Sequence, residues 1–310
     1  HPVVVVVARA LRAQAAEQRP ARREFPLDGE PRRQGRRADA VVVVEAGGPD
    51  GAGGGRSFQR RAGLELDEEA VGHLAVEAGQ SAVGDIFKWY VDKHLPAAHA
   101  KGNPYASLEK EAARLAPGES GLLALDWHNG NRTILVDPLL TGGIVGLTLR
   151  TTPAEIYRAL VEATAFGALV IVQRVEKYGI KIKEVVTCGG LAEKSPFMMQ
   201  IYADVLNRPM RISRSAQSCA LGAAMFGALA AGAFGGDAIR AQKAMTGTKA
   251  IVYKPIPANV KAYARLAAIY RQLHDAFGVA GSAHGLANVM KDLVAIRTAA
   301  RGGIKRRQAK

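Results

Sequence analysis

The stretch VVTCGGLAEKSPFMMQIYADVLNRP, residues 185–209, decides the fold of this chain. Its first residues are β-branched and predict a short strand, which ends at the pair Gly189 and Gly190. Ser195 followed by Pro196 predicts the start of a helix, with the serine as N-cap and the proline in the first turn. Apolar residues then recur every three or four positions, so one face of that helix should pack on a sheet.

A strand that ends in glycines ahead of a helix is a place where a nucleotide can bind. Glycine carries no Cβ, so the backbone at Gly189 and Gly190 can approach a ligand closely. Backbone amides near a helix N-terminus also offer donors and a positive dipole to phosphate groups. Taken alone, a glycine pair after a strand is more often an ordinary tight turn, and both interpretations stay open at this point.

Before this stretch, the pattern predicts a helix, a strand and a second, long helix. Residues 75–96 carry an apolar helical face that ends at a proline, and residues 122–130 begin as a strand and break at a turn. Thr152 and Glu155 have the spacing of a capping box, which predicts the start of the long helix.

After this stretch, the pattern predicts a strand at 209–214 and helices at 219–231 and 258–278. Small residues in the helix at 219–231 permit a close approach, so we expect it to pack on the sheet, whereas the helix at 258–278 is amphipathic. Strands that alternate with helices indicate an α/β domain with a mostly parallel sheet.

The composition divides the chain into three parts. Residues 1–73 are crowded with Arg, Ala, Gly, Pro and Val, contain no lysine and show no sustained hydrophobic periodicity. Because GC-rich DNA encodes these residues in almost any frame, we interpret this segment as disordered or translated out of frame. Residues 74–297 carry the periodic pattern of a folded domain, and residues 298–310 are a basic tail.

The formal net charge of +14 is concentrated at the two ends of the chain. Residues 1–62 and residues 301–310 each contribute +5, and the part between them is nearly balanced. Solvated basic ends explain this distribution, and no aromatic residues are interleaved with the basic ones. We therefore expect no nucleic acid partner, although a basic nucleic-acid-binding protein is the alternative that the net charge suggests.

Cysteine, histidine and hydropathy patterns argue against three further classes of protein: disulfide-rich, metal-binding and membrane proteins. Cys188 and Cys219 are too few for a disulfide framework, and we expect both to be buried thiols in a reducing, cytoplasmic compartment. The histidines show no metal-ligand spacing, so no metal site is expected. The apolar run at 220–234 is shorter than the roughly 20 residues of a membrane helix, so we expect no membrane association and interpret the run as a core helix.

Five blocks of sequence resemble the C-terminal domain of FGGY-type carbohydrate kinases, in the order in which that family has them. The resemblance is to the branch that phosphorylates ribulose, and the segment at 253–278 resembles that branch in particular. The blocks are EAGQSAVGDIF at 77–87, LDWHNGNRTILVDPLLTGGIVGLTL at 125–149, PAEIYRALVEATAFG at 153–167, CGGLAEKSPFMMQIYADVLNRP at 188–209 and ALGAAMFGALAAG at 220–232.

The resemblance implies an actin-like, ribonuclease-H-like ATPase fold in which two domains close on ATP and a sugar. It implies an enzyme that uses ATP and Mg²⁺ to phosphorylate the terminal hydroxyl of ribulose, and it implies that Glu77 meets the sugar hydroxyls. The residues that it places at the nucleotide are Gly84, Lys88, Gly189, Gly190 and Lys194.

Each of these assignments has a structural alternative. Gly84 is also consistent with a glycine that packs between helices, Lys194 with a solvated lysine, and Glu77 with an ordinary acid near a helix N-terminus.

The chain also departs from the family pattern. The catalytic aspartate and a phosphate-binding Gly-Thr turn of the family lie before the block that begins at Glu77. Asp50 is flanked by small residues as that aspartate is, but no Gly-Thr turn follows it, so we interpret the match as coincidence. We therefore expect no catalytic residue and little or no activity in this chain alone, because phosphoryl transfer needs a carboxylate at the attacking hydroxyl. The alternative is a non-catalytic nucleotide-binding module of the actin-like group, for which a homodimer is one open assembly.

Overall fold

The computed structural model describes residues 4–10, 38–45, 65–69, 73–177, 180–283, 293 and 295–301. In this part of the chain, seven strands form one sheet in the order β3-β4-β1-β2-β7-β8-β9, and two short strands pair as β5 and β6. The strands of the large sheet are β1 (Val4–Ala10), β2 (Ala38–Glu45), β3 (Glu65–Glu69), β4 (His73–Ala78), β7 (Ile180–Cys188), β8 (Met210–Ser213) and β9 (Thr248–Tyr253), and the short pair is β5 (Leu123–Leu125) and β6 (Gly143–Val145).

The large sheet is mixed rather than mostly parallel. Strand β7 runs parallel to both β2 and β8, while the strands toward either edge pair antiparallel. The parallel arrangement expected from the strand–helix alternation is therefore confined to the β2, β7 and β8 centre. There the stretch at 185–209 supplies the end of β7 and leads through two helices into β8.

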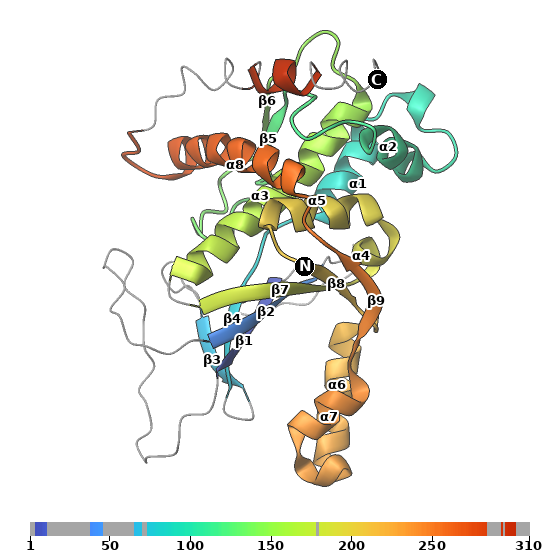
Figure 1. The fold of residues 1–310 in the computed structure, drawn as a ribbon, viewed down its shortest axis with the longest axis vertical. Coiled ribbons are helices and arrows are strands. Elements are labelled where there is room, and N and C mark those ends of the chain that lie inside the picture. The colour runs from blue at the N-terminus through green and yellow to red at the C-terminus, as the bar shows by residue number, and fades with distance from the viewer. Residues whose placement is uncertain are drawn as a thin grey trace.

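Helices cover one side of the large sheet, with α3 and α5 nearest to it and α8 across them (Figure 1). Helix α3 is the central element, since it packs against α1, α2, α5, β5 and β7. The helices are α1 (Gly84–Lys93), α2 (Pro104–Ala112), α3 (Pro153–Lys177), α4 (Gly190–Lys194), α5 (Pro196–Leu206), α6 (Ser218–Ala230), α7 (Ala238–Met245) and α8 (Pro257–Gly278), with 3₁₀ turns η1 (Ala97–His99) and η2 (Ala233–Gly236).

The predicted start signals of α3 and α5 are confirmed. Glu155 N–H donates to Thr152 Oγ1 over 3.3 Å, and Thr152 N–H donates to Glu155 Oε2 over 2.8 Å, which completes the capping box. Ser195 Oγ accepts from Met198 N–H over 3.1 Å at the start of α5. Both caps satisfy backbone donors that a helix leaves unpaired at its first turn.

Replacing Thr152 by alanine is expected to lower the free energy of unfolding by about 1 kcal/mol, because a capping hydroxyl is lost. Thr152→Ser keeps the hydroxyl and should stay near the parent protein. Urea denaturation followed by circular dichroism measures both variants. Equal stability of the alanine and serine variants would show that the cap contributes nothing.

Two expectations about these elements are wrong. The helix expected from residue 75 begins at Gly84, because residues 73–78 pair as β4. The helix expected at Ser195 is confirmed, but the short helix α4 precedes it, so the glycine pair opens a helical turn directly.

The second wrong expectation concerns the core helix: α6 has no buried residue, and Cys219 in its first turn is exposed, whereas Cys188 is buried. Helix α6 projects with α7 beyond the β9 end of the sheet (Figure 1). Within the described chain its strongest contacts are with α7 and η2. Apolar composition indicates that a helix needs a partner, but does not identify it.

Three stretches of residues 1–73 belong to the sheet, as β1, β2 and β3. The valine runs of β1 and β2 are β-branched, which suits a pleated strand. Most of the remaining residues of this segment lie outside the described chain, and the boundary at residue 74 stays a prediction. No helix among the described residues is long and apolar enough to span a bilayer.

Candidate functional site

The turn between β7 and α4 contains the glycine pair of the opening stretch. Gly189 has a φ of 90°, a conformation that side chains other than glycine rarely adopt, so this position requires glycine. Gly190 is exposed, and a Cβ built on it would meet no atom within 4 Å. The backbone at Gly190 is thus open to a ligand from outside, and the turn fits a nucleotide that needs close approach to main-chain atoms.

An ion pair connects helix α4 to the edge strand β9. Lys249 Nζ on β9 donates to Glu193 Oε1 over 2.6 Å, with both side chains partly exposed. Lys194, the neighbouring residue, is exposed to solvent. The pair holds the short helix in place, and Lys194 is left on the surface near the turn.

Gly84 and Lys88 lie on α1, at its first residue and one turn later. The Lys88 ammonium is exposed and donates to Asp92 Oδ2 on the same helix, and this hydrogen bond raises the pKa of Lys88. Lys88 therefore keeps its positive charge, and it would have to leave Asp92 to reach a phosphate.

Glu77 is on β4, where its backbone is in register with Val5 of β1 and Glu65 of β3. The chain leaves β4 after Ala78 and runs through residues 79–83 into α1, so Glu77 and Gly84 lie on either side of one short connection. Asp50 lies outside the described residues.

The residues named from the sequence fall into two groups. Glu77, Gly84 and Lys88 belong to β4 and α1, whereas Gly189, Gly190 and Lys194 belong to the β7–α4 turn. Helix α1 packs on α3, and α4 packs on β7 and α5. Among the described residues, no hydrogen bond or ion pair joins one group to the other.

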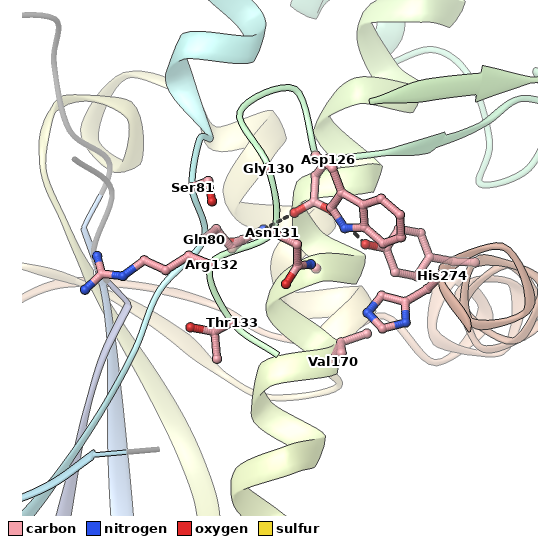
Figure 2. A pocket seen from close by; sticks show the side chains of 12 residues that line it. Gln80, Ser81, Asp126, Gly130, Asn131, Arg132, Thr133, Val170 and His274 are labelled. Carbon is pink, nitrogen blue, oxygen red and sulfur yellow. Dashed lines mark hydrogen bonds between the residues drawn. The ribbon is translucent and has the colours of Figure 1, made fainter. Parts of the chain in front are cut away.

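A small polar cavity lies beside the β4–α1 connection, and sequence reasoning assigned no role to the residues around it. It is lined by Gln80 and Ser81 of the connection, by Asp126 and the loop after it, and by side chains of α3 and α8 (Figure 2). Gln80 Nε2 donates to Asp126 Oδ2 and to the Thr164 carbonyl, each over 2.8 Å. Tyr270 O–H donates to the other carboxylate oxygen, Asp126 Oδ1, over 2.6 Å.

Asp126 is buried, and burial raises the pKa of its carboxyl group. The hydrogen bonds donated by Tyr270 and Gln80 oppose this shift, because they lower the pKa. The signal for this cluster was present in the sequence as a carboxylate directly after the apolar strand β5. Periodicity alone does not tell whether such a residue faces solvent or a buried donor, so the cluster was missed.

Gly167 on α3 makes the close packing of this cluster possible. A Cβ at Gly167 would lie 2.2 Å from Asp126 Oδ2 and 2.5 Å from Gln80 Nε2. The sequence placed Gly167 on the inward face of the long helix, and the structure gives the reason for glycine there. Asp126 and Gln80 occupy the space that any larger residue would need.

Comparisons with known proteins agree with this architecture. The model of the FGGY family of carbohydrate kinases, C-terminal domain, matches residues 56–231. The chain is 50% identical over 245 residues to a ribulokinase of Halalkalibacterium halodurans and 49% identical over 240 residues to a ribulokinase of Anoxybacillus flavithermus. These alignments cover 76% and 74% of this chain but 43% and 42% of those proteins, so the chain spans less than half of their length.

A solved structure is similar over the same region. The xylulose kinase from Rhodospirillum rubrum aligns with a TM-score of 0.59 and 28% sequence identity, covering 69% of this chain and 42% of that one. The actin-like ATPase fold expected from the sequence is confirmed by this likeness.

Proposed function

Because the chain belongs to the FGGY family of carbohydrate kinases, we propose that it is the C-terminal part of a ribulokinase-like enzyme. The reaction transfers the γ-phosphoryl group of ATP to the terminal hydroxyl of ribulose and yields ribulose 5-phosphate and ADP. The observation that carries the proposal is the 50% identity over 245 residues to a protein named ribulokinase. Such a reaction serves the breakdown of pentoses such as arabinose in the cytoplasm.

The β7–α4 turn is our candidate for the nucleotide side of the site. Gly189 takes the left-handed conformation that the turn requires, and Gly190 leaves its outer face open for the nucleotide. We assign the exposed cations Lys194 and Lys88 to the phosphate oxygens, and Lys88 would then exchange Asp92 for the ligand. Bound ATP with Mg²⁺ supplies the transferable phosphoryl group.

Glu77 is our candidate for the sugar side, at the start of the connection that ends in Gly84. A carboxylate suits sugar hydroxyls because it accepts hydrogen bonds only. The first buried carboxylate after residues 77–87 is Asp126. It is not a candidate general base. It is 6% exposed and already accepts from Tyr270 and Gln80.

Replacing Gly190 by alanine is expected to weaken Mg-ADP binding about tenfold, roughly 1.4 kcal/mol, because the new methyl group would occupy the space offered to the nucleotide. The fold should be unaffected, since the methyl group meets no protein atom within 4 Å. Isothermal titration calorimetry measures the affinity. Gly143→Ala on β6 is the matched control, because its methyl group is also free of contacts.

Two results would contradict the proposal. Absence of Mg-ADP binding to the parent chain at millimolar concentration would remove the nucleotide site. Equal affinities of the parent and the Gly190→Ala variant for Mg-ADP would show that the nucleotide does not bind at the β7–α4 turn.

Turnover by the chain alone is a separate measurement. We expect little ribulose-dependent ADP release, because no aspartate followed by a Gly-Thr turn was found ahead of Glu77. A coupled assay with ribulose and xylulose side by side tests this, and a high rate with ribulose would show that the chain carries its own catalytic carboxylate.

A further inference from the structure

A groove between strand β6 and the helical residues 295–301 lies apart from the two groups of candidate site residues. It has a volume of about 340 Å³ and is lined by Gly121, by β6 and the turn after it, and by Leu293 and Arg297. Figure 1 shows the helical residues 295–301, in red, next to β6. Clefts of about 300–1,000 Å³ are the usual size for small ligands. We propose that this groove binds a small organic anion with an apolar body, of the class of aryl or alkyl carboxylates.

The walls of the groove are apolar. Ile144 and Val145 of β6 are half-buried, Leu293 is buried, and Leu147 at the rim is 54% exposed. A hollow that leaves apolar surface in contact with water is typical of a ligand groove. These side chains offer no hydrogen bonds, so a sugar or a nucleotide phosphate would lose its hydration here without replacement. The walls therefore favour an apolar ligand body.

Arg297 is the charged residue of the groove. Of the described residues that line it, no other carries a charge. Its aliphatic stem lies along the backbone of Gly121, since a Cβ built there would be 3.0 Å from Arg297 Cδ and 3.2 Å from Arg297 Cβ. The structure records no hydrogen bond or ion pair from its guanidinium to any described residue, whereas Arg301 one turn later pairs with Glu155 Oε1 over 3.3 Å. Arg297 thus has a packed stem and guanidinium donors left for a ligand.

The sign of the charge at the groove favours an anion. No acidic residue is among the described residues that line it. Residues 298–310 of the sequence contain five basic side chains and no acid, so this end of the chain is itself a poor occupant for a groove with an unpaired arginine. A carboxylate, by contrast, can accept two parallel hydrogen bonds from one guanidinium. An apolar body with one carboxylate complements both the walls and Arg297.

Isothermal titration calorimetry of the full chain with 2-naphthoate tests the proposal, and 2-naphthamide is the matched neutral probe. Both probes present the same double ring to the walls, but only naphthoate has a charge for Arg297. We expect naphthoate to bind at least about tenfold more tightly than naphthamide, because a hydrogen bond to a charged group adds affinity. Arg297→Gln should remove this preference and leave the affinity for naphthamide nearly unchanged.

Two results of this titration would overturn the proposal. One is equal affinity of the parent chain for the two probes, including no binding of either. The other is a preference for naphthoate that survives Arg297→Gln. Arg174→Gln on α3 is the control, because Arg174 is also half-buried and does not line the groove, so its replacement should keep the preference.

A second variant tests the apolar wall. Leu147→Asp should weaken binding of both probes at least about tenfold, and the fold should tolerate it because Leu147 is already 54% exposed. Leu149→Asp is the matched control, since Leu149 is in the same loop, fully exposed and not part of the lining. If the two aspartate variants weaken both probes equally, or neither does, the probes bind elsewhere and the groove is not their site.

Nuclear magnetic resonance of methyl groups supplies the position. We expect naphthoate to shift the signals of Ile144 and to leave those of Ile251, an exposed residue on β9, unchanged. Saturating Mg-ADP should not displace the probe, because the β7–α4 turn shares no residue with the groove. Displacement by Mg-ADP would place the probe at that turn, and shifts confined to α6, where Phe226 is exposed, would place it on that helix. Either outcome would refute the groove as the binding site.

Discussion

Replacing Arg158 by alanine should lower the free energy of unfolding by about 3–5 kcal/mol, which is the usual cost of breaking a buried ion pair. Arg158 on α3 is 5% exposed, and its Nε donates to Glu162 Oε1 over 2.7 Å. Its Nη1 donates to the carbonyl oxygens of Ala112 and Leu115, each over 2.9 Å. One guanidinium therefore connects the end of α2 to α3.

The same guanidinium reaches α8. Arg158 Nη2 donates to Tyr263 Oη over 2.7 Å, and Tyr263 O–H donates to Glu162 Oε1 over 2.9 Å. In the alanine variant, Glu162 would be an enclosed carboxylate with one remaining donor, and two carbonyl oxygens would lose their partner. Unpaired buried groups of this kind are the main source of the loss.

Urea denaturation at neutral pH measures the effect, with Arg174→Ala as the control. Arg174 lies on the same helix, but the structure records no hydrogen bond or ion pair from its side chain among the described residues. We expect its replacement to change the free energy of unfolding by less than about 0.5 kcal/mol. A similar small change for Arg158→Ala would mean that the network does not stabilise the fold.

Gly167→Ala should also destabilise the chain strongly, by about 3 kcal/mol or more, through overpacking and loss of hydrogen bonds. The added methyl group would lie 2.2 Å from Asp126 Oδ2. Asp126 has little freedom to move away, because Tyr270 holds its other oxygen over 2.6 Å. Thermal and urea unfolding both measure the loss.

Two further variants separate the clash from the general effect of alanine in a helix. Gly227→Ala on α6 adds a methyl group that meets no atom within 4 Å, and it should leave stability equal or raise it by up to about 1 kcal/mol. In Gly167→Ala combined with Asp126→Ala the main obstacle is removed, so the two losses should not add. If the losses in the free energy of unfolding of the two single variants simply add in the double variant, Asp126 is not the residue that excludes a side chain at position 167.

The sequence predicted those parts of the fold that depend on residues close together in the chain, and missed those that depend on pairing between distant segments. The capping box at Thr152 and the N-cap at Ser195 are confirmed because each needs only residues three or four positions apart. The helix at 75–96 was placed too early, because β4 forms by pairing with β1, and such pairing leaves no local trace in the sequence.

The candidate site divides in the same way. The glycine pair could be proposed from the sequence because glycine is visible as a residue type, and the structure shows that the positive φ of Gly189 requires it. The cluster of Gln80, Asp126 and Tyr270 was not found, because its members meet only after three distant segments pack together. Helix α6 shows the reverse case, an apolar pattern whose partner the described chain does not contain.

The sequence by itself determined the local elements and, through its family blocks, the kinase family, since both depend on residue type and short spacing. Only the tertiary structure decided which strands pair, that the sheet is mixed, and that Gly167 gives room to a buried carboxylate. The reason is physical: capping and helical periodicity act between neighbours along the chain. Burial and hydrogen bonding of a side chain depend on atoms that are remote in sequence until the chain has folded.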